Sequence, residues 1–227
     1  MAAKDSQSSL SDGRPCTADL LEELIMARRS IRRYTDRPVP EAWIEAVLRC
    51  GAQAPSPSNS QPVRFARIVS KNLRDSLHQA LLDGHARLLD RNREKGGGAK
   101  LRNRINTYRR YAEFMVHAPV LMALGLTSGG MTFAGHLVAA DLMDHDPRQG
   151  VDGLITVGLA LKGMLLKAQA LGLGSCILTA PLVFIREAEQ LLGLPDFRLA
   201  CLLTLGFADE SPPPGTRLPL EAVCKVL

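Results

Sequence analysis

One apolar helix dictates much of the fold expected of this chain. From Asp152 to about Leu171 the sequence is apolar on nearly all sides of a helical projection, and such a helix is stable only where other elements cover it. Lys162 and Lys167 interrupt the run, which leaves it too short for a membrane span. Gly172-Leu-Gly174 follows and is typical of a helix end. We therefore expect a central buried helix in a domain that does not cross a membrane.

The rest of the pattern predicts helices and strands in mixed order. Apolar or alternating segments typical of strands fall at 63–70, 119–126, 175–179 and 198–206. Helical spacing of apolar residues falls at 17–29, 40–53, 71–93, 100–116, 134–143 and 182–192. Neither an internal repeat nor a linker divides these segments. We expect one α+β domain over residues 17–227, preceded by a flexible tail over residues 1–16.

The cysteines indicate a reducing compartment. They are odd in number and form no CxxC pair, which favours free thiols in a cytoplasmic protein over a disulfide framework or a zinc site. The five are Cys16, Cys50, Cys176, Cys201 and Cys224. The first thirteen residues are polar and lack the apolar core of a secretory signal. For Cys50 and Cys176 a small buried side chain is a simpler interpretation than a nucleophile, because no base is indicated beside them.

The formal net charge of +5 is unevenly placed. One run of arginines lies between residues 28 and 37, and a second run of cations lies between residues 91 and 110. Such clusters attract phosphates. For the second run a solvated helix face is the simpler interpretation. A non-catalytic basic protein that binds nucleic acid through it is the alternative of another class, although 4% aromatic residues are few for base stacking.

The common cofactor and metal motifs are absent. No GxGxxG, P-loop or HExxH pattern occurs, so the sequence does not support dinucleotide, nucleotide-triphosphate or zincin sites of those kinds. One compact acidic group with a histidine occurs in the segment 141–146, with Asp141, Asp144, His145 and Asp146. It is interpreted as a solvated helix end, with metal binding as the alternative.

Three segments carry residues suited to a phosphorylated aromatic ligand. Arg28-Arg29-Ser30-Ile31-Arg32 offers guanidiniums and a hydroxyl to a phosphate, although arginines at a helix end also meet the negative end of its dipole. The loop 54–62 (APSPSNSQP) holds amide side chains that suit a heterocyclic edge, between prolines that limit its freedom; an ordinary surface turn is the alternative. The segment 172–180 (GLGSCILTA) is a strand with small residues that would let backbone approach a flat ligand, or a plain core strand.

Together and in this order, these segments resemble the FMN-dependent nitroreductase family. The most specific parts are RRSIRRYTDRPVP and APSPSNSQP. DGLITVGLALKGMLLKAQALGLGSC resembles the buried helix of that family, and LTLGFADESPPPGTRLPLEAV resembles its closing strand and final basic residue. The resemblance implies a mainly antiparallel central sheet flanked by helices, in an intertwined homodimer with FMN in a cleft at its interface. The resemblance is weakest over residues 71–116; we expect this helical stretch, with Gly96-Gly97-Gly98 as its hinge, to form a lid that influences specificity.

The resemblance also implies a function and a set of site residues. Arg28, Arg29, Ser30, Arg32 and Arg217 would meet the FMN phosphate, and the loop residues and the strand end would meet the ring. The complete set is Arg28, Arg29, Ser30, Arg32, Pro55, Ser56, Asn59, Gln61, Leu178, Thr179, Ala180 and Arg217. No side-chain acid or base is implied.

The expected activity is NAD(P)H-dependent reduction of nitroaromatics, quinones or similar acceptors by ping-pong hydride transfer. The alternative within flavin chemistry is an oxidase or dehydrogenase. Val63 and the pair Thr179-Ala180 depart from the residues often found there, which concerns substrate preference more than FMN binding.

Overall fold

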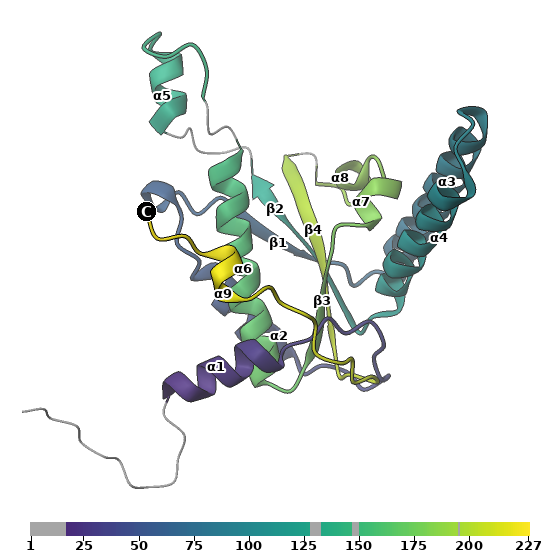
Figure 1. The fold of residues 1–227 in the computed structure, drawn as a ribbon, viewed down its shortest axis with the longest axis horizontal. Coiled ribbons are helices and arrows are strands. Elements are labelled where there is room, and N and C mark those ends of the chain that lie inside the picture. The colour runs from purple at the N-terminus through teal and green to yellow at the C-terminus, as the bar shows by residue number, and fades with distance from the viewer. Residues whose placement is uncertain (1–16, 128–132, 147–149, 195) are drawn as a thin grey trace, which may run out of the picture.

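The computed structural model describes residues 17–127, 133–146, 150–194 and 196–227, so the tail expected over residues 1–16 lies outside it. Its centre is a four-stranded antiparallel sheet in the order β1-β2-β4-β3 (Figure 1). The strands are β1 (Val63–Arg67), β2 (Val120–Thr127), β3 (Gly174–Leu178) and β4 (Phe197–Gly206). The helices are α1 (Thr17–Ala27), α2 (Glu41–Ala52), α3 (Lys71–Glu94), α4 (Ala99–Glu113), α5 (Phe133–Ala139), α6 (Val151–Ala170), α7 (Pro181–Phe184), α8 (Ala188–Leu191) and α9 (Leu220–Val223). The α+β class and the mainly antiparallel sheet are confirmed.

Helices cover both faces of the sheet. Along β2, Met122 and Leu124 pack against α2 and α6, whereas Leu121 and Ala123 face the layer formed by α3, the end of α4, α7 and α8. Because successive strand residues point to opposite faces, a strand covered on both sides reads as a continuous apolar run. This explains why β2 and β4 are apolar almost throughout. Among the described residues, no helix combines the length and apolarity needed to cross a bilayer.

Within one chain, the expected burial of α6 is found on one side of the helix only. One side of α6 packs on the sheet and on α2, but Leu154 and Ile155 on the other side are 49% and 51% exposed. Leu20 and Leu21 of α1 are similarly exposed. An apolar helix side without a covering element is typical of an interface with another chain.

Helices α3 and α4 form a long hairpin that projects from the body of the domain (Figure 1). Gly96, at a φ of 67°, takes the left-handed conformation that reverses the chain between them. The single helix expected over 182–192 is wrong in detail: Ile185 is extended and divides it into α7 and α8. Ile185 is 4% exposed, so burial of this side chain in the core holds the break.

Candidate functional site

The arginine segment is fixed against the start of β3. After α1 ends, Ser30 forms a parallel bridge with Ser175, and the Ile31 amide donates a hydrogen bond of 3.0 Å to the Ser175 carbonyl. A Cβ on Gly174 would lie 2.8 Å from the Cβ of Ile31, which is too close for two carbon atoms. Glycine at this position therefore lets the arginine segment lie directly on β3.

Two further residues hold the segment from the other side. The backbone amides of Arg32 and Arg33 both donate to one carboxylate oxygen of Glu210. The Tyr34 hydroxyl donates to the Ile31 carbonyl at 2.7 Å and lies 2.8 Å from Oγ1 of Thr204. Burial raises the pKa of Tyr34, so this hydroxyl keeps its proton and remains a donor at physiological pH.

The three arginines do not play the same part. Arg29 turns back and donates to the carbonyls of Met26 and Arg28 at 2.6 and 2.9 Å, as expected of a cation at a helix end. By contrast, the ion pairs of the described residues include neither Arg28 nor Arg32. Burial raises the pKa of the Cys176 thiol, while Arg32, Arg28 and a hydrogen bond with Ser30 act in the opposite direction. Arg28 and Arg32 thus flank Ser30 in the sequence, and Ser30 is bridged to Ser175 at the start of β3.

This donor set suits a phosphate group. Two guanidiniums without a carboxylate partner and a hydroxyl can each donate to phosphate oxygens. Charge-assisted hydrogen bonds of this kind are roughly twice as strong as neutral ones. The interpretation as a simple helix end thus holds for Arg29, whereas Arg28 and Arg32 remain available to an anion.

The third predicted segment lies at the far end of the same strand. Leu178 is buried, and the carbonyls of Thr179 and Ala180 accept hydrogen bonds of 3.1 Å from residues of α7. Four residues separate Ser175 from Thr179, which is about 13 Å along an extended strand. A ligand with a phosphate tail and a flat ring could therefore lie along β3, with its tail beside Arg28 and Arg32.

The proline-rich loop is tightly organised. Ser58, Asn59 and Gln61 have φ of 49°, 53° and 45°, a conformation that is uncommon outside glycine. The Ser56 hydroxyl accepts from the Gln61 amide at 2.8 Å, and the Gln61 side chain donates to Oδ1 of Asn59 at 3.2 Å. Pro55 is exposed at the start of this loop. Strained backbone of this kind persists only where surrounding contacts enforce it, and it is often found at functional sites.

Within one chain, however, the loop lies far from the arginines. It precedes β1, where the Pro62 carbonyl accepts from Thr127, and Thr127 pairs with Phe197 of β4. Ser175 pairs with Leu205, at the other end of β4 and on its other side. Eight residues separate these two points of β4, or about 27 Å. One chain therefore groups Arg28, Ser30, Arg32 and 178–180 along β3, and leaves Pro55, Ser56, Asn59 and Gln61 at the opposite edge of the sheet.

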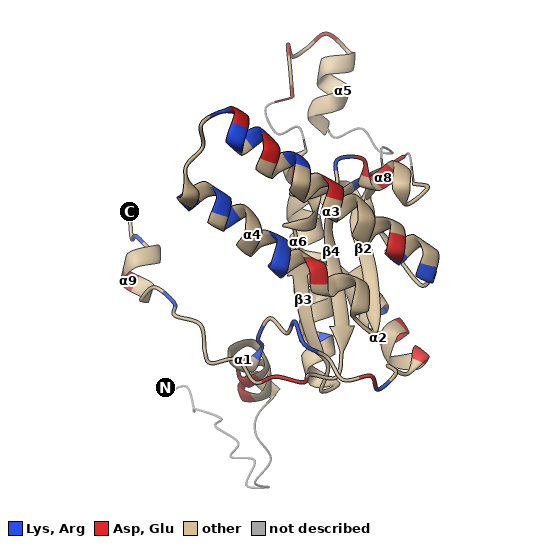
Figure 2. Ribbon diagram, turned by 90° about the vertical axis from the view of Figure 1, so that its right-hand side faces the viewer, with Lys and Arg blue, Asp and Glu red and all other residues tan. Residues whose placement is uncertain are grey.

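Arg217 lies in the exposed C-terminal segment. Its guanidinium donates to the neighbouring Thr216 carbonyl at 2.9 Å. Figure 2 shows that α9, which follows this residue, stands apart from the sheet and its helices. The convergence of Arg217 with Arg28 and Arg32 stays a prediction.

Two residues at this site were not expected from the sequence. Glu210 fixes the backbone of the arginine segment although 177 residues separate it from Arg33, and no local pattern indicates that contact. Tyr111 of α4 has its ring centre 5.3 Å from the guanidinium carbon of Arg32. The chain has only three tyrosines, Tyr34, Tyr108 and Tyr111. Their small number is the only feature of the sequence that could have marked them as candidate site residues.

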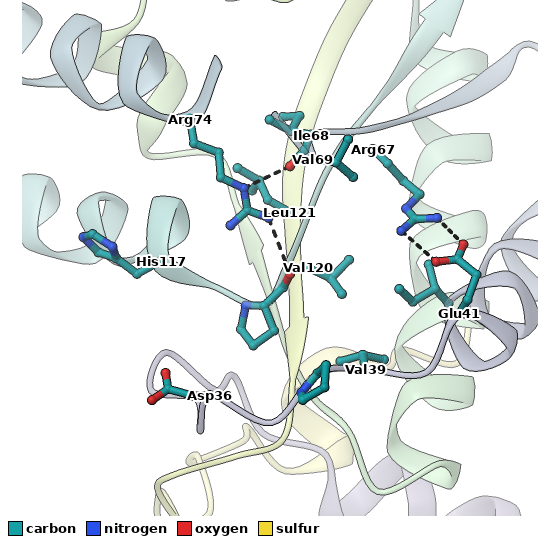
Figure 3. Close-up of a pocket in the computed structure, with 13 residues that line it drawn as sticks. Asp36, Val39, Glu41, Arg67, Ile68, Val69, Arg74, His117, Val120 and Leu121 are labelled. Atoms are coloured by element: carbon teal, nitrogen blue, oxygen red, sulfur yellow. Dashed lines mark hydrogen bonds and ion pairs between the residues drawn. The ribbon is translucent and has the colours of Figure 1, made fainter. Parts of the chain in front are cut away.

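A separate cavity of about 380 Å³ lies where β1, β2 and the start of α3 meet (Figure 3). Two arginines line this cavity, and the guanidinium of each is already bonded to other groups of the protein. Arg67 forms a two-point ion pair with Glu41. Arg74 donates from Nε to the Ile68 carbonyl at 3.0 Å, and further to carbonyls between Val116 and Pro119. This cavity therefore offers no free cation to a phosphate. Within the described ranges, no group of three or more His, Cys, Asp or Glu is placed to hold a metal, in the segment 141–146 or elsewhere.

Known proteins resemble this chain over most of its length. The model of the Nitroreductase family matches residues 25–207. The 4-nitrobenzoate reductase of Nocardioides sp. is 24% identical over 225 residues, covering 86% of this chain and 83% of the relative. The crystal structure of a BluB-like flavoprotein from Clostridium difficile 630 superimposes with a TM-score of 0.74 at 22% identity, covering 91% and 98% of the two chains. The NADPH:FMN oxidoreductase of Vibrio harveyi, complexed with NAD+, gives a TM-score of 0.64 at 22% identity, covering 91% and 76%.

These matches identify the fold and the family of the chain. The superpositions confirm the expected nitroreductase fold, and the matched residues 25–207 include the arginine segment, the proline-rich loop and β3. On the extent of that match, this chain belongs to the Nitroreductase family.

Proposed function

We propose that the protein is an FMN-dependent oxidoreductase that uses NAD(P)H to reduce nitroaromatics, quinones or similar electron-poor acceptors. The observation that carries this proposal is the donor set at the start of β3. Arg28 and Arg32 have no carboxylate partner among the described ion pairs and flank Ser30, which is bridged to Ser175 at the start of β3. The names of the relatives support the activity, since they include an NADPH:FMN oxidoreductase and a 4-nitrobenzoate reductase.

The residues present fit FMN. Arg28, Ser30 and Arg32 would hold the phosphate, and the backbone of Leu178, Thr179 and Ala180 would lie near the ring. The chemistry that FMN supplies when bound is uptake of a hydride and delivery of electrons to an acceptor. The protein's part is to fix the cofactor in place and to supply donors where negative charge develops. Arg29, which donates to the carbonyls of Met26 and Arg28, would support the backbone of this site. Arg217 of the C-terminal segment would also contact the phosphate.

The site is proposed to be shared between two chains. The loop with Pro55, Ser56, Asn59 and Gln61 lies about 27 Å along β4 from the arginine segment of its own chain, a greater distance than one FMN can bridge. A second copy related by a twofold axis would bring its loop to this chain's arginines. The exposed apolar residues of α1 and α6 offer the surface for such a homodimer. The cytoplasmic location expected from the cysteines remains part of this proposal.

The proposal is tested by the visible absorbance of the purified protein. We expect a flavin spectrum that bleaches when NADPH or NADH is added without oxygen, and that returns when a quinone or nitroaromatic is added. The double variant Arg28→Ala/Arg32→Ala should lose the flavin. Arg49→Ala is the control, because its side chain is 69% exposed and pairs with Glu45 within α2, outside the arginine segment.

Three outcomes would count against the proposal. A wild-type protein that binds no FMN would overturn it. A flavin that neither NADPH nor NADH bleaches would instead favour the oxidase or dehydrogenase alternative. Equal loss of FMN in Arg49→Ala would show that the binding depends on general positive charge rather than on the two arginines of the segment.

A further inference from the structure

The backbone of the arginine segment passes from one neighbouring segment to another. Ser30 pairs with Ser175 on β3, whereas Tyr34 pairs with Ala208, in the segment that follows β4. Residues 32–33 lie at the crossing between these two pairings. Because backbone amides in folded proteins are almost always bonded, the group that accepts from the amides of residues 32–33 determines how the crossing is held.

A single carboxylate, that of Glu210, supplies this acceptor. One of its oxygens accepts from the amides of Arg32 and Arg33 at 2.5 and 3.1 Å, and the other lies 3.6 Å from Nε of Arg33. Two successive amides that point at one anion form a concavity of the kind that binds anions, and here the protein's own carboxylate fills it. Glu210 therefore fixes the backbone from which the Arg32 side chain extends.

The negative charge of Glu210 opposes the positive charge of Arg32 at two nearby groups. Burial raises the pKa of the Cys176 thiol, the charge of Arg32 lowers this pKa, and the charge of Glu210 raises it. Burial also raises the pKa of Tyr34, and there too Glu210 raises the pKa whereas Arg32 lowers it. The two charges thus act on the same groups with opposite signs. A phosphate attracted by Arg32 would be repelled by Glu210.

We propose that Glu210 is a positioning residue with two opposed effects on the FMN phosphate: its acceptor oxygen strengthens binding by fixing the arginine segment, and its charge weakens binding. The inference rests on the proposed FMN site. Glu210 acts through the backbone of residues 32–33 and through its charge, so both effects concern the phosphate and not the flavin ring. Removing the whole side chain and removing only its charge should therefore change the affinity for FMN in opposite directions.

The test compares the binding of FMN with that of riboflavin, which lacks the phosphate, by equilibrium dialysis of the full-length protein against each flavin. Glu210→Ala removes the acceptor and should weaken FMN binding about tenfold, the effect of losing one charge-assisted hydrogen bond. Glu210→Gln keeps an acceptor oxygen without the charge, so FMN should bind at least as tightly as to the wild type, by up to about twofold. Both variants should bind riboflavin as the wild type does.

Asp209→Ala is the matched control. Asp209 is exposed, and its carboxylate is absent from the ion pairs found among the described residues. Its removal takes away the same charge one residue earlier and leaves the amide contacts in place, so FMN binding should not weaken. Arg33→Ala removes the ion pair with Glu210 and keeps both amide contacts, and should weaken FMN binding by less than about threefold. If it weakens FMN binding as much as Glu210→Ala does, the ion pair holds the segment and the proposal fails.

Three further results would overturn the role of Glu210. These are wild-type FMN affinity in Glu210→Ala, a Glu210→Gln protein that binds FMN as weakly as Glu210→Ala, and an equal weakening of FMN and riboflavin, which would indicate general damage to the fold. A wild-type protein that binds neither flavin would instead refute the proposed function. FMN binding by the wild type, together with unchanged binding by Glu210→Ala, would refute only the inference about Glu210.

Discussion

Replacing Gly174 with alanine tests whether close packing holds the arginine segment on β3. The new methyl carbon would lie 2.8 to 2.9 Å from three atoms of the Ile31 side chain, whereas carbon atoms normally approach to about 3.5–4.0 Å. Either Ile31 or β3 must therefore move by roughly 0.7 Å or more. Ile31 is only 6% exposed, so it has little free space into which to move. Ser30 and Arg32 adjoin Ile31 and would be displaced with it.

The expected cost follows from opposing effects. Overpacking of this kind costs about 1–3 kcal/mol, and the reduced freedom of the unfolded chain returns about 0.4–1 kcal/mol. Gly174→Ala should therefore lower the free energy of unfolding by roughly 1–2 kcal/mol and also weaken FMN binding. Urea denaturation followed by circular dichroism measures the first effect, with all samples at one protein concentration because a dimer's stability depends on it.

Gly98→Ala provides the control for this experiment. Gly98, the N-cap of α4, has a φ of −76° and no atom within 4 Å of an added Cβ, so its replacement causes no clash and should cost only the N-cap preference for glycine over alanine, about 0.5 kcal/mol. A Gly174→Ala protein with the wild-type urea midpoint and the wild-type FMN affinity would refute the packing argument.

Three further predictions concern the rest of the chain. Arg74→Met should lower the free energy of unfolding by about 2–4 kcal/mol, measured by urea denaturation, because buried carbonyls near the strand ends lose their donor; an unchanged midpoint would contradict this. Burial raises the pKa of Cys201 to about 12, while the unfolded thiol ionises near about 8.5. The unfolding free energy should therefore fall as the pH rises from about 9, by up to ~1.4 kcal/mol per pH unit, and Cys201→Ala should make this fall shallower. In the native protein a thiol reagent should label Cys224, which is exposed, and should reach buried Cys176 only on unfolding; labelling at equal rates, seen by peptide mass spectrometry, would refute the burial.

Local pattern was sufficient to predict most of the elements. Helices and strands follow from the spacing of apolar residues, and the observed bounds of α3, at 71–94, and of β4, at 197–206, differ from the predicted ones by one residue. The position of α6 in the sequence was also predicted, but the exposure of one of its sides was not. A helix side that another chain would cover carries the same apolar residues as one that its own sheet covers, so a single sequence does not distinguish them.

For the site as well, local sequence predicted the contiguous residues but not the contacts between distant segments. The donors of the arginine segment are contiguous in sequence, and the structure fixes this segment on the start of β3. The anchor at Glu210 depends on a contact across 177 residues, which no spacing rule contains. The separation of the proline-rich loop from the arginines follows from strand order and register, and these are tertiary properties.

The central claim is that one FMN is held by the arginine segment of one chain and the proline-rich loop of another. It is tested most directly by the FMN content of a hybrid dimer, formed from an Arg28→Ala/Arg32→Ala chain and an Asn59→Ala/Gln61→Ala chain carrying different affinity tags. Each variant alone should bind FMN poorly, because both of its sites lack one half. The purified hybrid should bind about one FMN per dimer, since twofold symmetry leaves it one intact site and one doubly defective site. A hybrid that binds no more FMN than its parents would show that the site is not shared in this way.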